Sequence, residues 1–399
     1  MVAPAYTPTM TEHVTTSGTD GDDEVVPAPI AIDESALVDL RERLERTRLP
    51  DVETVADWSQ GLPLAYAQEL RATWSSTYDW RRVEATLNRF GPGRTTIDGV
   101  GIHFLHHRSP HPDALPLVLT HGWPGSVVEF LRVIEPLTDP TAHGGRAEDA
   151  FHVVVPSLPG YGFSEAPTTT GWGRDRIADA WAELMSRLGY ERFGAQGGDW
   201  GSMVTAALAV QHPERVAGIH LTLAVVVPPA ATLADLTSAE QATLDGFSHY
   251  QRWDGGYSAQ QSSRPQTLGY SLADSPMGQA AWIIEKFWSW TDNDGHPEDV
   301  VDRDTLLDNV MLYWLTNTAT SSARLYWESF HDLDARPITV PVGASIYPGE
   351  IFRPSRRWLE SRCADLRYFA EPERGGHFAA MEQPASFVDE VRAAFATMR

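Results

Sequence analysis

The sequence is poor in cysteine, in lysine and in long apolar runs. Cys363 is its only cysteine, which excludes an intrachain disulfide and a metal cluster built on cysteines and fits a reducing compartment. Lys286 is its only lysine. No apolar run approaches the roughly 20 residues that a membrane-spanning helix needs. The first 28 residues lack the basic start and apolar core of a secretory signal. We therefore expect a cytoplasmic protein without a membrane partner.

Positive charge is scarce as well. The chain has 31 basic residues against 54 acidic ones, a formal net charge of −23. Such a charge repels the phosphates of nucleic acids and of anionic membranes, so that neither is an expected partner. With 399 residues, 42% of them hydrophobic, the chain is long enough to bury a large core. These properties favour a folded protein that acts on small molecules, and they leave a homodimer open.

The chain begins with residues that favour disorder and continues with helical patterns. Residues 1–28 are rich in Thr, Pro and Asp and predict a disordered tail. Helical spacing of apolar residues follows at 35–48, 64–77 and 78–90. Residues 95–106 then read as two strands around the Asp98-Gly99 turn. We expect an N-terminal helical segment over residues 29–112 that leads into the first strands.

Short apolar strands and helices alternate in the rest of the chain. Strands are expected at 116–120, 151–156, 216–223, 338–345 and 366–369, and helices at 174–188, 202–210 and 384–398. This alternation predicts an α/β protein with a mainly parallel, doubly wound sheet, built from residues 113–225 and 337–399. Residues 226–336 are irregular and rich in aromatics. They predict a helical lid over the carboxyl edge of the sheet.

The most reactive stretch is Gln196-Gly197-Gly198-Asp199-Trp200-Gly201, which lies between an expected strand and an expected helix. Small residues two positions on either side of a reactive one describe a nucleophile elbow. Asp199 stands at the apex, which disfavours a serine esterase. A carboxylate is ionised at neutral pH without help from a base, and its natural target is a strained saturated carbon. An ordinary strand-to-helix turn has the same pattern, so the interpretation depends on partners elsewhere.

An elbow nucleophile needs a histidine from a late loop and an acid from the preceding one. His377 follows the last expected strand, among glycines that let the backbone turn its ring inward. Glu350 follows the penultimate strand and is the favoured acid. Glu371 and Glu373 lie nearer to His377 in sequence and remain alternatives.

The elbow also needs two backbone amides that stabilise an oxyanion. One comes from the residue after the nucleophile, here Trp200, and the other from a loop after an early strand. Trp123 is the natural second donor, because it lies in His121-Gly122-Trp123-Pro124 directly after such a strand. Pro124 makes this turn rigid, and its peptide bond could be cis. A plain turn without this role is the alternative.

Four separated motifs give the chain a clear resemblance. They are His121-Gly122-Trp123-Pro124-Gly125-Ser126, Pro159-Gly160-Tyr161-Gly162-Phe163-Ser164, Gln196-Gly197-Gly198-Asp199-Trp200-Gly201 and Gly375-Gly376-His377-Phe378-Ala379-Ala380. In this order they resemble the epoxide hydrolases of the α/β-hydrolase superfamily. The helical patterns before residue 91 resemble the microsomal and juvenile-hormone branch of that family. The likeness covers about residues 30–399. The chain lacks the N-terminal anchor helix of the membrane-bound members, so we do not expect a microsomal location.

The resemblance implies a role for each candidate residue. Asp199 would be the nucleophile, His377 the base that activates water, and Glu350 the acid that orients the histidine. Tyr257 and Tyr326 match two lid tyrosines that act as acids, whereas Tyr270 and Tyr313 are competitors that we expect to serve in packing. The reaction implied is hydrolysis of an epoxide to a vicinal diol with water and without a metal or organic cofactor. The aromatic residues at 226–336 favour a bulky, apolar or aromatic epoxide, either a xenobiotic or a secondary metabolite.

Two other functions share parts of this pattern. A haloalkane dehalogenase also has Asp-Trp at its elbow, but its halide leaves without a proton and needs no tyrosine pair. A non-catalytic ligand-binding homologue is the second alternative, and the three filled positions Asp199, His377 and Glu350 argue against it.

Overall fold

The protein is described by a computed structural model over residues 24–399. A nine-stranded sheet has the order β1-β2-β3-β5-β4-β6-β7-β8-β9. Pairing is antiparallel from β1 to β5 along this order and parallel from β5 to β9. The strands are β1 (Val26–Pro27), β2 (Pro92–Ile97), β3 (Val100–His107), β4 (Leu115–Thr120), β5 (Phe151–Pro156), β6 (Phe193–Gly197), β7 (Val216–Leu221), β8 (Ile338–Ser345) and β9 (Cys363–Ala370). The prediction of a mainly parallel α/β sheet is confirmed.

Helices cover both faces of the sheet. Successive strand residues point to opposite faces. A Cβ atom on Gly194 would overlap Phe395 of α15 (Pro384–Ala396), whereas one on Gly197, three residues later, would overlap the backbone of Gly201 in α6 (Asp199–Gln211). Helix α5 (Arg174–Arg187) packs beside α6, and the short α4 (Ile134–Thr138) beside α15. The sheet is therefore doubly wound, as its sequence pattern predicts.

The N-terminal segment is helical after one short strand. Residues 1–23 of the expected tail lie outside the described residues, but residues 24–28 contradict that expectation, because Val26 and Pro27 pair with β2. Helices α1 (Glu34–Glu45), α2 (Leu64–Ser76) and α3 (Trp80–Arg89) follow. The side chain of Asp33 caps α1 by accepting from the Ser35 amide. Helix α1 ends three residues earlier than its pattern predicts.

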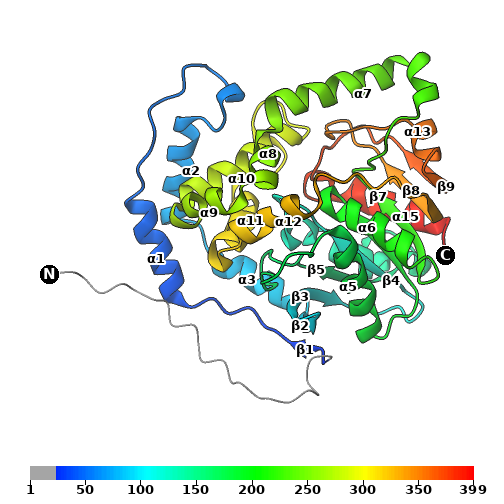
Figure 1. Ribbon diagram of the computed structural model, residues 1–399. Helices are drawn as coiled ribbons and strands as arrows, with labels where there is room; N and C mark the ends of the chain where they lie inside the picture. The colour runs from blue at the N-terminus through cyan, green and yellow to red at the C-terminus, as the bar shows by residue number, and fades with distance from the viewer. Residues whose placement is uncertain (1–23) are drawn as a thin grey trace.

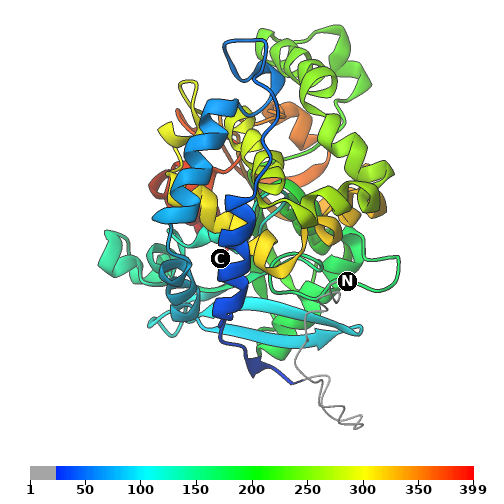
Figure 2. The same ribbon diagram turned by 90° about the vertical axis from the view of Figure 1, so that its left-hand side faces the viewer.

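Residues 226–336 form an insertion of helices between β7 and β8, which we call the helical insertion. Its α-helices are α7 (Ser238–His249), α8 (Gly256–Ser263), α9 (Pro265–Asp274), α10 (Pro276–Trp290), α11 (Arg303–Thr316) and α12 (Ala319–Ser329), and a π-helix spans Tyr250–Asp254 between α7 and α8. Figure 1 shows α7 along the top of the molecule and α8 to α12 grouped above β3 and β5. Helices α1 and α2 run alongside the insertion (Figures 1 and 2). The N-terminal segment thus supports the insertion from outside.

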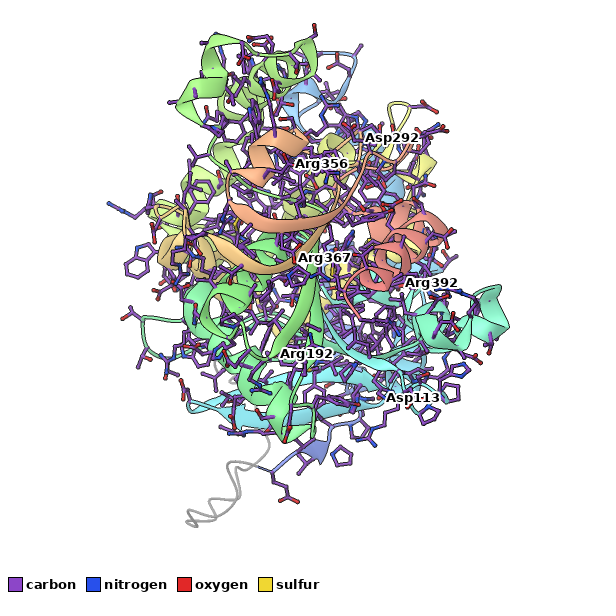
Figure 3. The ribbon with its side chains drawn as sticks, turned by 90° about the vertical axis from the view of Figure 1, so that its right-hand side faces the viewer. Asp113, Arg192, Asp292, Arg356, Arg367 and Arg392 are labelled. Atoms are coloured by element: carbon purple, nitrogen blue, oxygen red, sulfur yellow. The ribbon has the colours of Figure 1, made fainter. Side chains whose placement is uncertain are left out.

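The insertion covers the carboxyl edge of the parallel strands. Figure 3 shows Asp113 and Arg192, which precede β4 and β6, near the bottom of the molecule. Asp292, which follows α10, lies near the top. Its carboxylate accepts from Arg374 and from the Gly375 amide, in the loop after β9. Loops that leave the strands therefore meet the insertion at this edge, where an α/β sheet presents its functional groups.

Candidate active site

Asp199 lies on a sharp turn between β6 and α6. Its φ angle is 48°, a left-handed conformation that a residue with a side chain adopts only under strain. Two glycines make the turn possible, because a Cβ atom on Gly197 would overlap Gly201 and one on Gly201 would overlap the Thr120 carbonyl. The geometry is that of a nucleophile elbow, and it lifts the Asp199 carboxylate above the sheet.

His377 joins Asp199 to Glu350. Its Nε2 lies 3.4 Å from Oδ2 of Asp199, and its Nδ1 lies 2.7 Å from Oε1 of Glu350. The loops that carry Glu350 and His377 are themselves paired, with a bridge between Gly349 and Gly376. The three expected residues are thus brought together, and the alternatives Glu371 and Glu373 are exposed away from them.

The two carboxylates determine the charge state of the histidine. Burial lowers the pKa of His377, but the charges and hydrogen bonds of Glu350 and Asp199 outweigh burial and hold that pKa well above its usual value. The ring is therefore protonated at neutral pH as long as the Asp199 side chain is chemically unmodified. Any reaction that neutralises Asp199 removes one of the two anions and lowers the pKa of His377.

Trp123, one of the two expected oxyanion donors, contacts the Asp199 carboxylate. The Trp123 amide donates to Oδ1 of Asp199 over 2.7 Å, and the Trp123–Pro124 peptide bond is cis. Helix α11 fixes this loop, since Asn309 donates to the Pro124 carbonyl and Tyr313 to the Gly125 carbonyl. Trp200 lies in the first turn of α6, where amides have no carbonyl four residues earlier in the helix.

Tyr257 lies in α8 and Tyr326 in α12 of the helical insertion, and both are buried. Their hydroxyls are 3.5 Å apart. The Tyr257 ring stacks on Trp123 with centroids 4.8 Å apart, and Tyr326 packs edge-on against Trp200 at 4.9 Å. Burial raises the pKa of both tyrosines well above the usual value, so that each holds its proton at neutral pH. The two hydroxyls are hydrogen-bond donors set over the elbow.

The two competing tyrosines have other surroundings. Tyr313 is buried and, through the bond to Gly125, supports the Trp123 loop, which agrees with a packing role. Tyr270 is 74% exposed, so the expectation that it packs in the core is wrong. It lies on the solvent-exposed side of α9.

Three further residues belong to the surroundings of the site and are not evident from the motifs. The Tyr250 hydroxyl lies 3.0 Å from that of Tyr257. Burial raises the pKa of the Glu129 carboxyl, which feels the charges of His377 and Asp199, to about 8. The ammonium of Lys286 lies over the Tyr257 ring. Only Lys286 has a sequence signal, because it is the single lysine of the chain.

Neither a metal site nor a membrane span is found in the described part of the chain. Between residues 24 and 399, no group of three or more His, Cys, Asp and Glu side chains is placed to hold a metal ion. Over the same residues, every helix is too short or too polar to cross a bilayer.

Comparison with known proteins agrees with this geometry. The model of the epoxide hydrolase N terminus matches residues 25–130, and that of the alpha/beta hydrolase fold matches residues 116–270. A provisionally named epoxide hydrolase of Stigmatella aurantiaca is 57% identical, over 94% of this chain and 86% of the relative. Epoxide hydrolase 1 of Sus scrofa is 34% identical, over 93% of this chain and 88% of the relative.

Solved structures show the same likeness. The juvenile hormone epoxide hydrolase of the silkworm Bombyx mori superposes with a TM-score of 0.88 at 31% identity, covering 95% of this chain and 96% of the other. The Aspergillus niger epoxide hydrolase superposes with a TM-score of 0.86 at 31% identity, covering 96% and 98%. The sheet and the elbow define an α/β-hydrolase. Within that class, the chain belongs to the epoxide hydrolase family.

Proposed function

We propose that this protein converts an epoxide to a vicinal diol in two steps, through an ester on Asp199. The observation that carries the proposal is the position of the Asp199 carboxylate. One of its oxygens is bonded to the Trp123 amide, and the other faces His377. The buried hydroxyls of Tyr257 and Tyr326 pack against the tryptophans that flank the elbow. A nucleophile, two acids and a base thus converge on one region.

In the first step, Oδ2 of Asp199 attacks a carbon of the epoxide ring. Oδ1 is the oxygen that the Trp123 amide holds, so it becomes the carbonyl oxygen of the ester. The carbon–oxygen bond of the ring breaks, and its electron pair goes to the epoxide oxygen. A tyrosine hydroxyl, Tyr257 or Tyr326, gives that oxygen its proton. The product is a hydroxyalkyl ester and a phenolate.

In the second step, His377 activates water. Loss of the Asp199 charge lowers the pKa of His377, so the ring can release its proton as the phenolate takes one up. Neutral His377 then takes a proton from water, whose oxygen attacks the ester carbonyl. The amides of Trp123 and Trp200 stabilise the oxyanion, and one such donor is worth on the order of 3 kcal/mol. The bond between the Asp199 carbonyl carbon and the diol oxygen then breaks. That oxygen keeps the electron pair and takes the proton of His377, and the new Asp199 carboxyl returns its own proton to the ring.

The surroundings favour a bulky, apolar or aromatic epoxide. Aromatic rings gather around the reacting groups: Trp290 lies 5.0 Å from the His377 ring and 5.1 Å from the Tyr257 ring. We also propose a cytoplasmic location, which rests on the single unpaired cysteine of the chain.

One turnover in ¹⁸O-labelled water tests the ester. With enzyme in excess over styrene oxide, each active site reacts at most once, and we expect unlabelled diol because the first diol oxygen comes from Asp199. With styrene oxide in excess, repeated turnovers should place label in the Asp199 carboxylate. An Asp199→Asn variant should give no diol. Label in the diol of the first turnover would mean direct attack by water and would remove Asp199 from the mechanism.

A comparison of leaving groups separates the nearest alternative. A haloalkane dehalogenase has no use for a proton donor, so replacement of both tyrosines by phenylalanine would leave its activity intact. We expect the Tyr257→Phe, Tyr326→Phe double variant to lose styrene oxide turnover. Turnover of a bromoalkane by the unaltered protein at a comparable rate would favour the dehalogenase instead.

A further inference from the structure

The single lysine of the chain lies buried beside the proposed acid. Lys286 is in the last two turns of α10, and its side chain is only 6% exposed. The other basic side chains of the chain, apart from histidines, are arginines. Burial of an ammonium group costs free energy unless the charge is paired. We therefore expect groups that pair with Lys286.

Lys286 is held by groups from two elements. Its Nζ lies 2.8 Å from Oε2 of Glu285 and 3.6 Å from Oδ1 of Asp254, and it donates to the Asp254 carbonyl over 3.3 Å. Ser289 donates to the second carboxylate oxygen of Asp254 over 2.6 Å. Asp254 ends the π-helix, three residues before Tyr257. The ammonium is thus fixed at the start of the helix that carries the proposed acid.

The same ammonium lies over two aromatic rings of the site. Its Nζ is 5.1 Å from the ring centroid of Tyr257 and 5.6 Å from that of Trp290. Both distances are within the range at which a cation is attracted to a ring face. The attraction grows when a phenol loses its proton, because a phenolate ring carries more negative charge. A cation at this place therefore stabilises the deprotonated form of Tyr257 more than the protonated form.

We propose that Lys286 is a positioning residue that makes Tyr257 a better proton donor to the epoxide oxygen. It acts in ester formation and not in ester hydrolysis. In that step the Asp199–carbon bond forms, the ring carbon–oxygen bond breaks, and the proton of Tyr257 moves to the epoxide oxygen. The phenolate that remains faces the ammonium through its ring and the Tyr250 hydroxyl through its oxygen. The inference rests on the two-step mechanism proposed above.

Several charged and polar groups surround Lys286 and Tyr257. Glu285 and Asp254 face the ammonium, and the Asp199 carboxylate and the Tyr250 and Tyr326 hydroxyls face Tyr257. Lys286→Met keeps the length of the side chain and removes its charge. Glu285→Gln keeps the shape of the partner and leaves the ammonium less neutralised. A purely structural role predicts slower ester formation in Glu285→Gln, whereas an electrostatic role predicts no loss of rate.

Stopped-flow tryptophan fluorescence with styrene oxide separates the two half-reactions, since Trp123, Trp200 and Trp290 surround the site. In Lys286→Met we expect ester formation to slow on the order of tenfold, and ester hydrolysis to change less than about twofold. In Glu285→Gln, ester formation should stay the same or become faster. Lys286→Arg, which keeps the charge, should recover part of the rate that Lys286→Met loses.

Two results would overturn the role of Lys286. One is ester formation that slows in Glu285→Gln as much as in Lys286→Met. This would mean that the contact between Lys286 and Glu285 only holds the structure in place. The other is a folded Lys286→Met variant with unaltered ester formation. Both differ from failure of the two-step mechanism, in which the unaltered protein itself would form no ester.

Discussion

At the scale of single residues, the site depends on a glycine, which has no side chain, as well as on its reactive side chains. Gly122 lies beside Asp199, and a Cβ atom there would overlap the Asp199 carboxylate. The Trp123 amide donates to that same carboxylate. The Asp199 carboxylate is therefore held between a close backbone on one side and His377 on the other. Placement of reacting atoms within about 1 Å can decide a rate by a factor of about 100.

Gly122→Ala tests this close approach. The added methyl group has to displace the Asp199 carboxylate, so we expect kcat for styrene oxide to fall on the order of 100-fold, with a loss of stability of about 1–3 kcal/mol from overpacking. Gly246→Ala is the matched control, because its Cβ would meet nothing within 4 Å in an exposed helix. The control should keep its kcat and gain about 0.5–1 kcal/mol. An unaltered kcat in Gly122→Ala would show that the carboxylate has room to move.

At the scale of elements, the helices of the insertion carry groups that serve the sheet below. Helix α10 bears Lys286 and ends at Trp290, whose carbonyl accepts from the His377 amide over 2.8 Å. Helix α11 braces the Trp123 loop and is itself tied to the N-terminal segment. Its Asp308 accepts from the Tyr78 hydroxyl and from Arg82 of α3. Helices α10 and α11 thus each hold a loop of the site, and α11 is itself held by the N-terminal segment.

Asp308, which joins α11 to α3, makes the free energy of unfolding dependent on pH. Burial raises the pKa of its carboxyl to about 6, against the lowering effects of Arg82 and Tyr78. The folded state therefore binds this proton more tightly than the unfolded chain. The stability from that proton is fully present below the ordinary value of 3.8 and is lost as the pH rises through about 6.

Comparison with Asp308→Asn measures this contribution. The free energy of unfolding of the unaltered protein should rise relative to that of the variant as the pH falls from about 7 to about 5, in urea titrations at each pH. Asp304→Asn, an exposed site on the same helix, should show a much smaller change. A difference that is constant over this range would mean that Asp308 keeps its charge throughout.

At the scale of the whole molecule, the N-terminal segment packs on the insertion as well as on the sheet. Trp58 stacks on Trp288 with ring centroids 5.5 Å apart. Trp74 is buried, and its ring N–H donates to the Met311 sulfur over 3.3 Å. These contacts join residues more than 200 positions apart into one hydrophobic core with the sheet. We therefore expect the N-terminal segment, the insertion and the sheet to unfold together.

Trp74→Ala tests that coupling. Removal of a large buried side chain should lower the free energy of unfolding by about 3–5 kcal/mol in a single urea transition, followed by circular dichroism and by styrene oxide turnover. Trp253→Ala is the control, because Trp253 is 69% exposed and its loss should change stability by less than about 0.5 kcal/mol. Loss of turnover well before the main transition would show that the insertion opens independently.

Much of this architecture follows from local patterns in the sequence. Alternating apolar strands and helices predict the doubly wound sheet, because period-2 and helical spacing are properties of the backbone itself. The elbow is readable for the same reason, since only small residues permit the turn at Asp199. The chain order of Asp199, Glu350 and His377 places all three at one edge of a parallel sheet. Their closeness then follows from topology.

Other features depend on contacts that no local pattern encodes. The pairing of Val26 and Pro27 with β2, the exposure of Tyr270 and the bond between Tyr250 and Tyr257 each depend on how an element is turned against a distant one. Lys286 stands out in the sequence as the only lysine, but its place over the Tyr257 ring exists only once α8 and α10 are packed together. The sequence by itself thus determined the sheet, the elbow and the order of the reacting groups. Only the tertiary structure determined which charged groups and aromatic rings surround them, because burial and electrostatic fields arise from neighbours brought together in space.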